Sequence, residues 1–361
     1  MNNLEFIKSK ISYPLVIYHN KTYNQDANDT QIQKLINSKL IVIGDLHGNI
    51  KKALEILIVS DIVALDILDL ILFFDLFLDV NFGNDEIIVK LCNIIKSIKL
   101  SNNKKVIFLG DILADRVGND VLGLCFVNQL ALIGLDFKIL IGNHDHACNF
   151  EDLGAAKYMK DCCESFFLAF NIYDSGDFES KKEIELNLQK FLQKSKLLEF
   201  DKQNKTLFVH AGITKRNIKS FLKLFISLGI LKRGYELSET TFENFCIIAN
   251  QFYTDYRLGK YEAKKYVIEN KVLANIHSRN ERLLEGFLWV GEHDYLDSFE
   301  FFKSLGVETI VHGHDDYDRN SIFSPMNNGY KSNSDFTVIN LDNSQGKSLE
   351  SSIDTLPLYI A

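Results

Sequence analysis

The 361-residue chain has few of the residues that mark specialised classes of protein. Its six cysteines form no CxxC pair and are too sparse for a disulfide framework, so we expect a reducing compartment, namely the cytoplasm. It also has no excess of positive charge. The formal net charge is -8, which argues against general binding to nucleic acid or to anionic membranes. Only three prolines stand among many Lys, Asn and Ile residues, a composition typical of an AT-rich genome.

The sequence also lacks a secretory signal and an uninterrupted hydrophobic run. Residues 1–20 carry scattered charges and no apolar core ahead of a cleavage site. The most apolar stretch, residues 61–80, is interrupted by four aspartates: Asp66, Asp69, Asp75 and Asp79. Burying each carboxylate in a bilayer would cost on the order of several kcal/mol. We therefore reject a membrane span and predict an acidic, helical insertion whose role stays unassigned.

What the chain does have is a set of five segments in which a short apolar strand leads directly into a metal-binding residue type. These segments are LIVIGDLHGN (40–49), VIFLGDILADR (106–116), ILIGNHD (139–145), LFVHAG (207–212) and TIVHGHDD (309–316). One such segment would mean little, because an Asp after Gly often caps a helix or closes a turn. Five of them indicate that several strand ends converge on one cation site.

The segments between these strands have the spacing of helices. Residues 49–60 and 120–135 show apolar periodicity after the first and second strands, which is the alternation expected of a mostly parallel sheet. Residues 150–200 and 215–275 are also helical in pattern and interrupt the framework, so we predict a helical cap beside the site. Residues 336–341 predict a further strand, and the tail from residue 342 onward has no assigned role.

The residue types at the strand ends indicate the metal. Carboxylate, amide and imidazole ligands together suit Mn, Fe or Zn, and two such ions can share a bridging carboxylate. Asp45 and His47 occupy alternate positions and can reach a first ion, while Asp111 could bridge to a second. Three further side chains could complete the ligands of that second ion: Asn143, His210 and His314. Each taken alone also has a structural interpretation, since a single histidine is more often a core or surface residue.

The five motifs resemble those of the calcineurin-like metallophosphoesterases, and most of all the phosphoprotein phosphatase branch. GDLHGN, GDILADR, GNHD, VHAG and HGHD appear in the order of that family and cover the framework from about residue 40 to 341. The resemblance implies an α/β (α+β) fold with a two-sheet β core flanked by helices, in a single domain spanning residues 1–361. The framework would occupy about 40–150, 205–215 and 305–342, with helical insertions at about 58–95, 150–200 and 215–275.

The resemblance also implies a role for individual residues. Asp45, His47 and Asp111 would bind one metal ion, and the other would be held by Asp111, Asn143, His210 and His314. His144 would be the general acid, oriented by Asp115, and Arg116 would clamp the phosphate. Arg279 is our candidate for a second phosphate-binding arginine, with Arg282 as the alternative.

Several features depart from the family pattern. GDILADR has one more residue between its two aspartates than the usual protein-phosphatase form, and Asp145 stands where protein phosphatases commonly carry Glu. The long spacing from Asp45 to Asp111 locates an insertion around residues 58–95. His312 would lie behind the ligands or contact the substrate, and Asp316 would interact through water or as a weak ligand.

The function implied is that of a metal-dependent phosphomonoesterase. It would be a protein phosphatase that hydrolyses phospho-Ser/Thr or phospho-Tyr by direct attack of a metal-bridging hydroxide. Two divalent ions are expected, with Mn as the first choice and Fe or Zn as alternatives. His144 would protonate the leaving oxygen, a step worth roughly 10²–10⁴-fold.

Other functions and partners stay open at this point. One alternative is a hydrolase of dinucleoside polyphosphates or nucleotides, and another is a non-catalytic interaction scaffold that keeps the phosphatase framework. The expected substrate is a phosphoprotein or phosphopeptide, with no nucleic acid, no stable membrane insertion, and a protein partner contacted through the helical cap. A bacterial origin with export into a host cell, as an effector, is the alternative to a cytoplasmic location.

Overall fold

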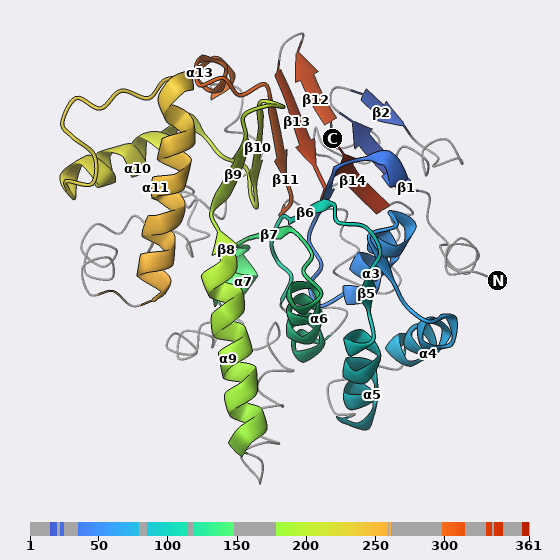
Figure 1. Ribbon diagram of the computed structural model, residues 1–361. Coiled ribbons are helices and arrows are strands. Elements are labelled where there is room, and N and C mark those ends of the chain that lie inside the picture. Colours follow the sequence, from blue (N-terminus) through green and yellow to red (C-terminus); the bar gives the residue numbers. More distant parts are fainter. Residues whose placement is uncertain are drawn as a thin grey trace. The chain divides into compact units, whose positions relative to one another are not determined.

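The computed structural model describes residues 15–19, 22–24, 35–78, 85–113, 119–147, 178–258, 260, 298–314, 330–333, 336–341 and 356–360. The chain divides into two compact units. The first comprises residues 1–139, 144–194 and 343–361, and the second comprises residues 140–143 and 195–342. Figure 1 labels their helices and strands.

The first unit contains a mixed sheet in which the strands follow the order β2-β1-β14-β3-β6-β7. Their bounds are β1 (Leu15–His19), β2 (Thr22–Asn24), β3 (Leu40–Ile43), β6 (Lys105–Phe108), β7 (Phe137–Leu140) and β14 (Leu356–Ile360). Strands β3, β6 and β7 are parallel. All four residues of β3, LIVI, are buried, as expected of a central parallel strand. Consequently the loops after β3 and β6 begin at the same edge of this sheet.

The last strand of the chain lies inside this sheet. Strand β14 pairs in parallel with β1 and antiparallel with β3, with Tyr359 opposite both Tyr18 and Val42. The Tyr359 side chain is fully buried. The tail segment LPLYIA, to which the sequence assigned no role, therefore supplies a strand that joins the N-terminal strands to the rest of the sheet.

Helices pack around this sheet and on one another. They are α3 (Ile50–Val59), α4 (Ile67–Leu78), α5 (Asp85–Lys96), α6 (Asp120–Leu132), α7 (Asn143–Ala147) and α9 (Phe178–Lys194), with a small antiparallel sheet of β4 (Val63–Ala64) and β5 (Lys99–Leu100). Helix α5 packs against both α4 and α6, and α6 also packs against α9. The expected helix at residues 49–60 is α3, which begins after Asn49, whose side-chain oxygen accepts the Lys52 amide.

The acidic stretch at residues 61–80 contains the whole of α4, with β4 ahead of it. Asp66 accepts the Leu68 amide at 2.9 Å as an N-terminal cap, and Asp69 accepts the Ser97 hydroxyl at 2.8 Å, which ties α4 to the end of α5. Leu68 is 73% exposed, so part of the apolar surface of this helix faces outward. Within the described residues, none of the helices combines the length and the apolar character that crossing a bilayer requires.

The second unit contains a sheet with the strand order β12-β13-β11-β10-β9. Its elements are β8 (Ser195–Lys196), β9 (Leu198–Asp201), β10 (Thr206–Val209), α10 (Lys215–Ser227), α11 (Glu239–Arg257), α13 (Phe299–Ser304), β11 (Thr309–His312), β12 (Tyr330–Asn333) and β13 (Phe336–Asn340). Strands β10, β11 and β13 are parallel, so the histidines that follow β10 and β11 emerge at one edge. The Asn250 side chain accepts the Leu197 amide and donates to the Leu198 carbonyl, which fastens α11 to β9.

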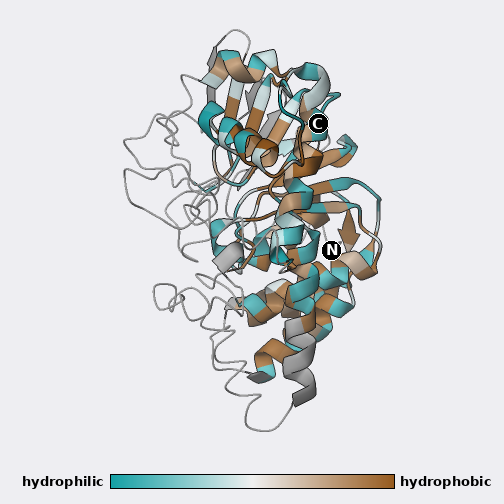
Figure 2. Cartoon of the chain, turned by 90° about the vertical axis from the view of Figure 1, so that its left-hand side faces the viewer, coloured by the Kyte–Doolittle hydropathy of each residue, from teal (hydrophilic) through white to brown (hydrophobic). Residues whose placement is uncertain are grey.

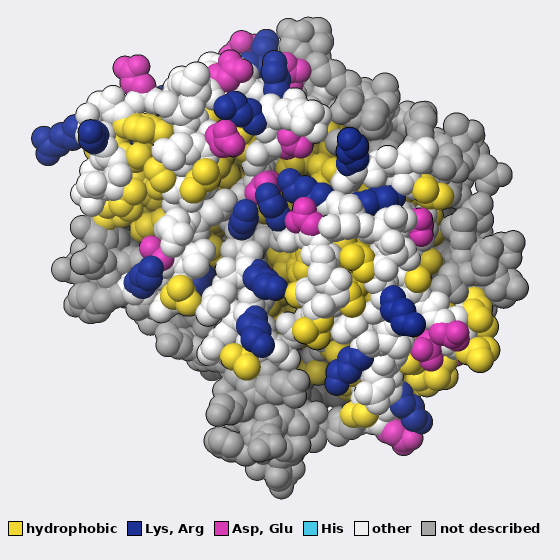
Figure 3. All heavy atoms as spheres, in the orientation of Figure 1, with side chains coloured by type: hydrophobic (Ala, Val, Ile, Leu, Met, Phe, Trp, Pro, Cys, Tyr) yellow, Lys and Arg dark blue, Asp and Glu magenta, His cyan; other side chains and the backbone are white. Residues whose placement is uncertain are grey.

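These observations confirm the mixed α/β class, with several sheets flanked by helices. In Figure 2 the helices carry both brown and teal bands, as amphipathic helices packed on a core do. Figure 3 shows Lys and Arg side chains spread over one face, with hydrophobic side chains between them. The five segments singled out in the sequence are β3, β6, β7, β10 and β11 with the residues that follow them.

Candidate metal centre

In the first unit, the loops after β3 and β6 are tied together through their backbones. The Asp111 carbonyl accepts the amides of Leu46 at 3.0 Å and His47 at 2.6 Å, and the Ile112 carbonyl accepts the Gly48 amide at 2.8 Å. These bonds satisfy buried peptide groups that lie outside regular secondary structure. As a result, the two loops that carry Asp45, His47 and Asp111 form one connected substructure.

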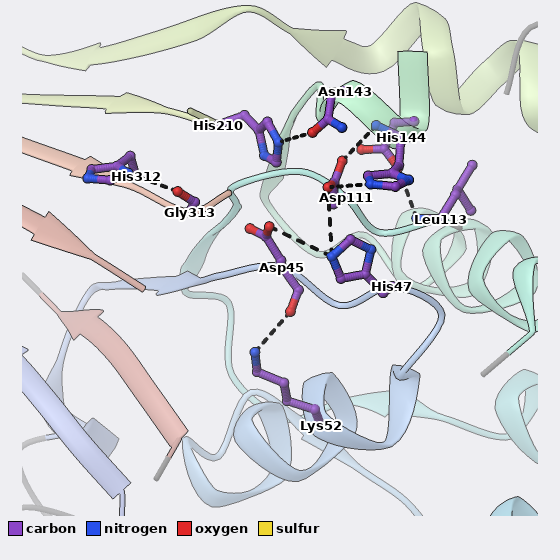
Figure 4. A network of polar contacts seen from close by, with 11 residues as sticks. Asp45, His47, Lys52, Asp111, Leu113, Asn143, His144, His210, His312 and Gly313 are labelled. Atoms are coloured by element: carbon purple, nitrogen blue, oxygen red, sulfur yellow. Dashed lines mark hydrogen bonds and ion pairs between the residues drawn. The ribbon is translucent and has the colours of Figure 1, made fainter. Parts of the chain in front are cut away.

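The side chains from these loops point toward one another (Figure 4). His47 Nε2 lies 4.0 Å from Asp45 Oδ2 and 3.8 Å from Asp111 Oδ2. His144 Nε2 lies 3.9 Å from the same Asp111 oxygen. Ligand atoms of His47, Asp111 and His144 all lie within 4.8 Å of one another. All four side chains are buried, so these two carboxylates and two imidazoles share a small volume shielded from water.

Helix α7 contributes a further pair of contacts from this unit. The His144 amide donates to Asp111 Oδ1 at 2.9 Å, and the His144 ring meets the His47 ring edge-on at 5.1 Å between centroids. The next residue, Asp145, is fully buried, and its Oδ1 accepts the Leu113 amide at 2.9 Å. Asp145 thus anchors the loop that carries Asp111. The sequence marked Asp145 only as a departure from the family motif, so this anchoring role was missed.

The second unit brings together Asn143, His210 and His314. Asn143 Oδ1 and His210 Nε2 are 2.9 Å apart, and the His210 and His314 rings lie 5.1 Å apart at 66°. The His210 carbonyl accepts the Gly313 amide at 2.7 Å, which joins the ends of β10 and β11. Asn143 and His210 are each 1% exposed.

His312 is the last residue of β11, two positions before His314, and is fully buried. Its Nδ1–H donates to the Gly313 carbonyl at 2.8 Å. Burial lowers the pKa of His312 to about 4, although the hydrogen bond to Gly313 acts in the opposite direction. The imidazole is therefore neutral at physiological pH.

The backbone conformation of the predicted ligands is unusual. Among the described residues, five non-glycine residues have a positive φ: His47, Asp61, Asp111, Lys205 and His314. Three of the five are predicted metal ligands, with φ of 47° for His47, 46° for Asp111 and 71° for His314. Such conformations cost on the order of 1–3 kcal/mol each and cluster at functional sites. The strain therefore coincides with the positions that the motifs select.

The donor set fits a divalent cation. Hard carboxylate and amide oxygens combined with imidazole nitrogens suit Mn, Fe or Zn. Two ligands at right angles, each about 2.1 Å from a metal, are about 3 Å apart. The 2.9 Å between Asn143 Oδ1 and His210 Nε2 matches that spacing. The 3.8–4.0 Å separations around His47 are wider, and they lie between that spacing and the roughly 4.2 Å that separates two ligands on opposite sides of an ion.

Several residues assigned from the sequence lie outside the described residues. They are Asp115, Arg116, Arg279, Arg282 and Asp316. The predicted ligands are all described, and within each unit they are near one another: Asp45, His47 and Asp111 with His144 in the first unit, and Asn143, His210 and His314 in the second. The contacts of Lys52 and Asp145 were not anticipated, because neither residue stands at a motif position for which the sequence indicates a ligand.

Comparison with known proteins defines the class as a phosphatase, a hydrolase acting on phosphate esters. Specifically, the chain belongs to the family of WipA-like phosphatase domains, whose model matches residues 105–347. The matched range includes Asp111, Asn143, His144, His210 and His314, whereas Asp45 and His47 precede it. No curated protein matches the sequence.

Two solved phosphatase structures are similar to this chain to different degrees. The phosphatase domain of the Legionella effector WipB superposes with a TM-score of 0.56 at 21% identity, covering 76% of this chain and 98% of that one. The cold-active protein-tyrosine phosphatase of a psychrophilic Shewanella species gives a TM-score of 0.41 at 14% identity, covering 85% of this chain and 70% of that one. The WipB match supports the mixed α/β fold described above.

Proposed function

We propose that the chain is a metal-dependent phosphomonoesterase of the calcineurin-like type that acts on phosphoproteins. The observation that carries the proposal is that residues of metal-ligand type occupy the positions where the backbone is strained. In a chain of a phosphatase family, carboxylates and imidazoles follow the strand ends, most of them are buried, and His47, Asp111 and His314 adopt a costly positive φ. A merely structural cluster would not require that backbone cost at those positions.

We assign the ligands of two ions. Asp45, His47 and Asp111 would hold the first, and the second would be held by Asp111, Asn143, His210 and His314. The grouping of these side chains within each unit supports the assignment. The order of residues along the chain supports it too, because Asn143 of the second unit and His144 of the first are consecutive residues. When bound, two divalent cations would activate water and stabilise charge on the phosphoryl oxygens.

We assign the remaining roles, proton transfer and phosphate binding, to side chains that are not metal ligands. The His144 imidazole, placed beside Asp111, would hold the proton that passes to the leaving oxygen. Asp115 would orient His144, and the Arg116 guanidinium would offer two parallel donors to the phosphate. Arg279 would supply a second positive charge to the dianionic ester. The Asp111 carboxylate would keep His144 nearby through the bond from the His144 amide.

The expected substrate is a phosphoprotein or phosphopeptide with phospho-Ser/Thr or phospho-Tyr. The helical segments around the framework are the surface through which we expect a protein partner to bind. Because WipB is a Legionella effector, we also propose delivery of this chain into a host cell. A single framework spanning about residues 40–150, 205–215 and 305–342 would carry the chemistry.

A substrate panel on metal-reconstituted protein tests this function. Phosphopeptides bearing Ser, Thr and Tyr esters, together with a dinucleoside polyphosphate, are incubated with Mn-loaded and chelator-treated chain, and phosphate release is measured. We expect release from at least one phosphopeptide only when Mn is present. Asp45→Asn and His210→Asn, one from each unit, should both remove it, whereas Asp136→Asn, an exposed aspartate before β7, should not. Turnover that persists after complete metal removal would refute the proposal.

A further inference from the structure

Lys52 is a buried cation beneath the loop that carries Asp45. The residue lies in the first turn of α3 and is only 2% exposed. Its Nζ donates a hydrogen bond of 2.9 Å to the Asp45 backbone carbonyl, and Figure 4 shows the side chain reaching from the helix to that carbonyl. Removing an ammonium from water is costly unless specific contacts offset the loss. A lysine at this position therefore needs a reason.

The contact fixes the Asp45 loop from a second side. On one side, the amides of Leu46 and His47 donate to the Asp111 carbonyl. On the other, Lys52 holds the Asp45 carbonyl while the Lys52 amide is itself held by the Asn49 side chain. The first turn of α3 and the ligand loop are thus locked together at both the backbone and the side chain.

The charge of Lys52 suits its surroundings. Asp45 and Asp111 are buried carboxylates whose Oδ2 atoms both lie within 4.0 Å of His47 Nε2. Before any cation binds, two such carboxylates in a dry volume repel one another. An ammonium bonded to the backbone of one of them supplies a fixed positive charge nearby. Such a charge would offset part of the repulsion between the two carboxylates.

We propose that Lys52 is a positioning residue of the metal centre, which holds the Asp45 loop so that the Asp45 carboxylate is preset for its ion. This inference rests on the function proposed above. Lys52 acts through Asp45 and not on substrate, because its ammonium is buried and bonded to backbone. Residues that support metal ligands in this way typically contribute about 10–100-fold to metal affinity.

Lys52→Met is the variant that tests the idea, since methionine keeps the apolar stem and removes both the donor and the charge. Calorimetric titration of chelator-treated protein with MnCl₂ should show about 10–100-fold weaker binding in the variant. Turnover of p-nitrophenyl phosphate should fall at limiting Mn and recover as Mn is raised, with the KM for the ester unchanged. Lys52→Arg, which keeps donors and charge, should lose less affinity than Lys52→Met.

Lys51→Met is the matched control. Lys51 is the preceding residue on the same helix, but its Nζ pairs with Glu55 at 3.3 Å and lies over the Phe74 ring at 5.0 Å. Losing this lysine removes the same charge without touching the Asp45 loop, so Mn affinity should match that of the wild type.

The outcomes separate this inference from the proposed function. If the wild-type chain binds Mn and Lys52→Met binds it equally well, the positioning role is refuted while the proposed function stands. A variant that melts earlier but gains the same thermal stabilisation from Mn would also refute it, since Lys52 would then be merely structural. If Lys52→Met does not fold, Lys52→Gln, which is uncharged and one atom shorter than lysine, takes its place in the same titration, and Mn binding equal to that of wild type refutes the positioning role. Absence of Mn binding by the wild-type chain would refute both proposals.

Discussion

Asp111→Asn separates the structural contacts of Asp111 from its charge. The Asp111 carbonyl holds the Leu46 and His47 amides, and its Oδ1 holds the His144 amide. Asparagine keeps both acceptors, so only the difference between a charged and a neutral hydrogen bond is lost, about 1 kcal/mol. Relief of repulsion with Asp45 and of carboxylate burial offsets that loss. We therefore expect the metal-free variant to melt within about 2–4 °C of wild type.

The metal-loaded proteins should differ far more. At a Mn concentration of about 100 times the wild-type Kd, binding should stabilise the wild type by about 2.7 kcal/mol, or roughly 5–11 °C at 2–4 °C per kcal/mol. If losing the Asp111 charge weakens binding about 100-fold, the variant gains only about 0.4 kcal/mol, near 1 °C.

The assay for this difference is thermal unfolding with and without Mn, after calorimetry has set the Mn concentration. Asp136→Asn, at an exposed position in the same unit, should behave as wild type in both conditions. An Asp111→Asn variant that gained the full wild-type stabilisation from Mn would show that Asp111 is not a ligand.

Three further perturbations follow from the structure. His144→Ala should reduce turnover of phosphoserine peptides by about 10²–10⁴-fold but that of p-nitrophenyl phosphate much less, because p-nitrophenolate leaves without protonation; equal losses in steady-state kinetics would contradict a general acid. Burial raises the pKa of Glu55, although the Lys51 ammonium acts in the opposite direction. The charged carboxylate therefore lowers the stability of the folded state above that pKa, and the folded state gains stability as the pH falls through it. Glu55→Gln should therefore raise the free energy of unfolding at neutral pH, and this gain should disappear in acid. Urea titrations at several pH values measure the difference between variant and wild type. A difference that stayed the same at every pH would show that burial of the charge is not the cause. Deleting residues 356–361 removes β14 from between β1 and β3 and should abolish cooperative unfolding of the first unit, whereas a sharp unchanged melting transition would show that β14 is dispensable.

The strands that precede the ligands could be predicted because their signal is local. Each is a run of β-branched or other apolar residues, as in LIVI of β3, that leads within a few residues to Asp, Asn or His. Helix α3 was equally predictable, since its apolar spacing lies between Asn49 and Ser60, which cap its two ends. The ligand types at the strand ends then indicated which side chains should meet.

Long-range features could not be predicted in the same way. The tail strand β14 is short and contains Pro357, and only its pairing with β1 and β3 makes it a strand. The positive φ of His47, Asp111 and His314 also could not be predicted from the sequence, because Asp and His adopt that conformation more often than most residue types but still only in a minority of positions. The contact made by Lys52 could not be predicted for another reason. A lysine on a helix normally faces water, and only the folded loop above it reveals the contact with Asp45.

We propose that the strand-end residues hold two divalent ions that the reaction needs. Elemental analysis of the chain, after Mn loading and removal of unbound metal, tests this most directly when phosphate release is measured on the same sample. We expect two ions per chain and a loss of activity in parallel with their removal. A chain that binds no ion under these conditions, yet still releases phosphate from a phosphopeptide, would contradict it.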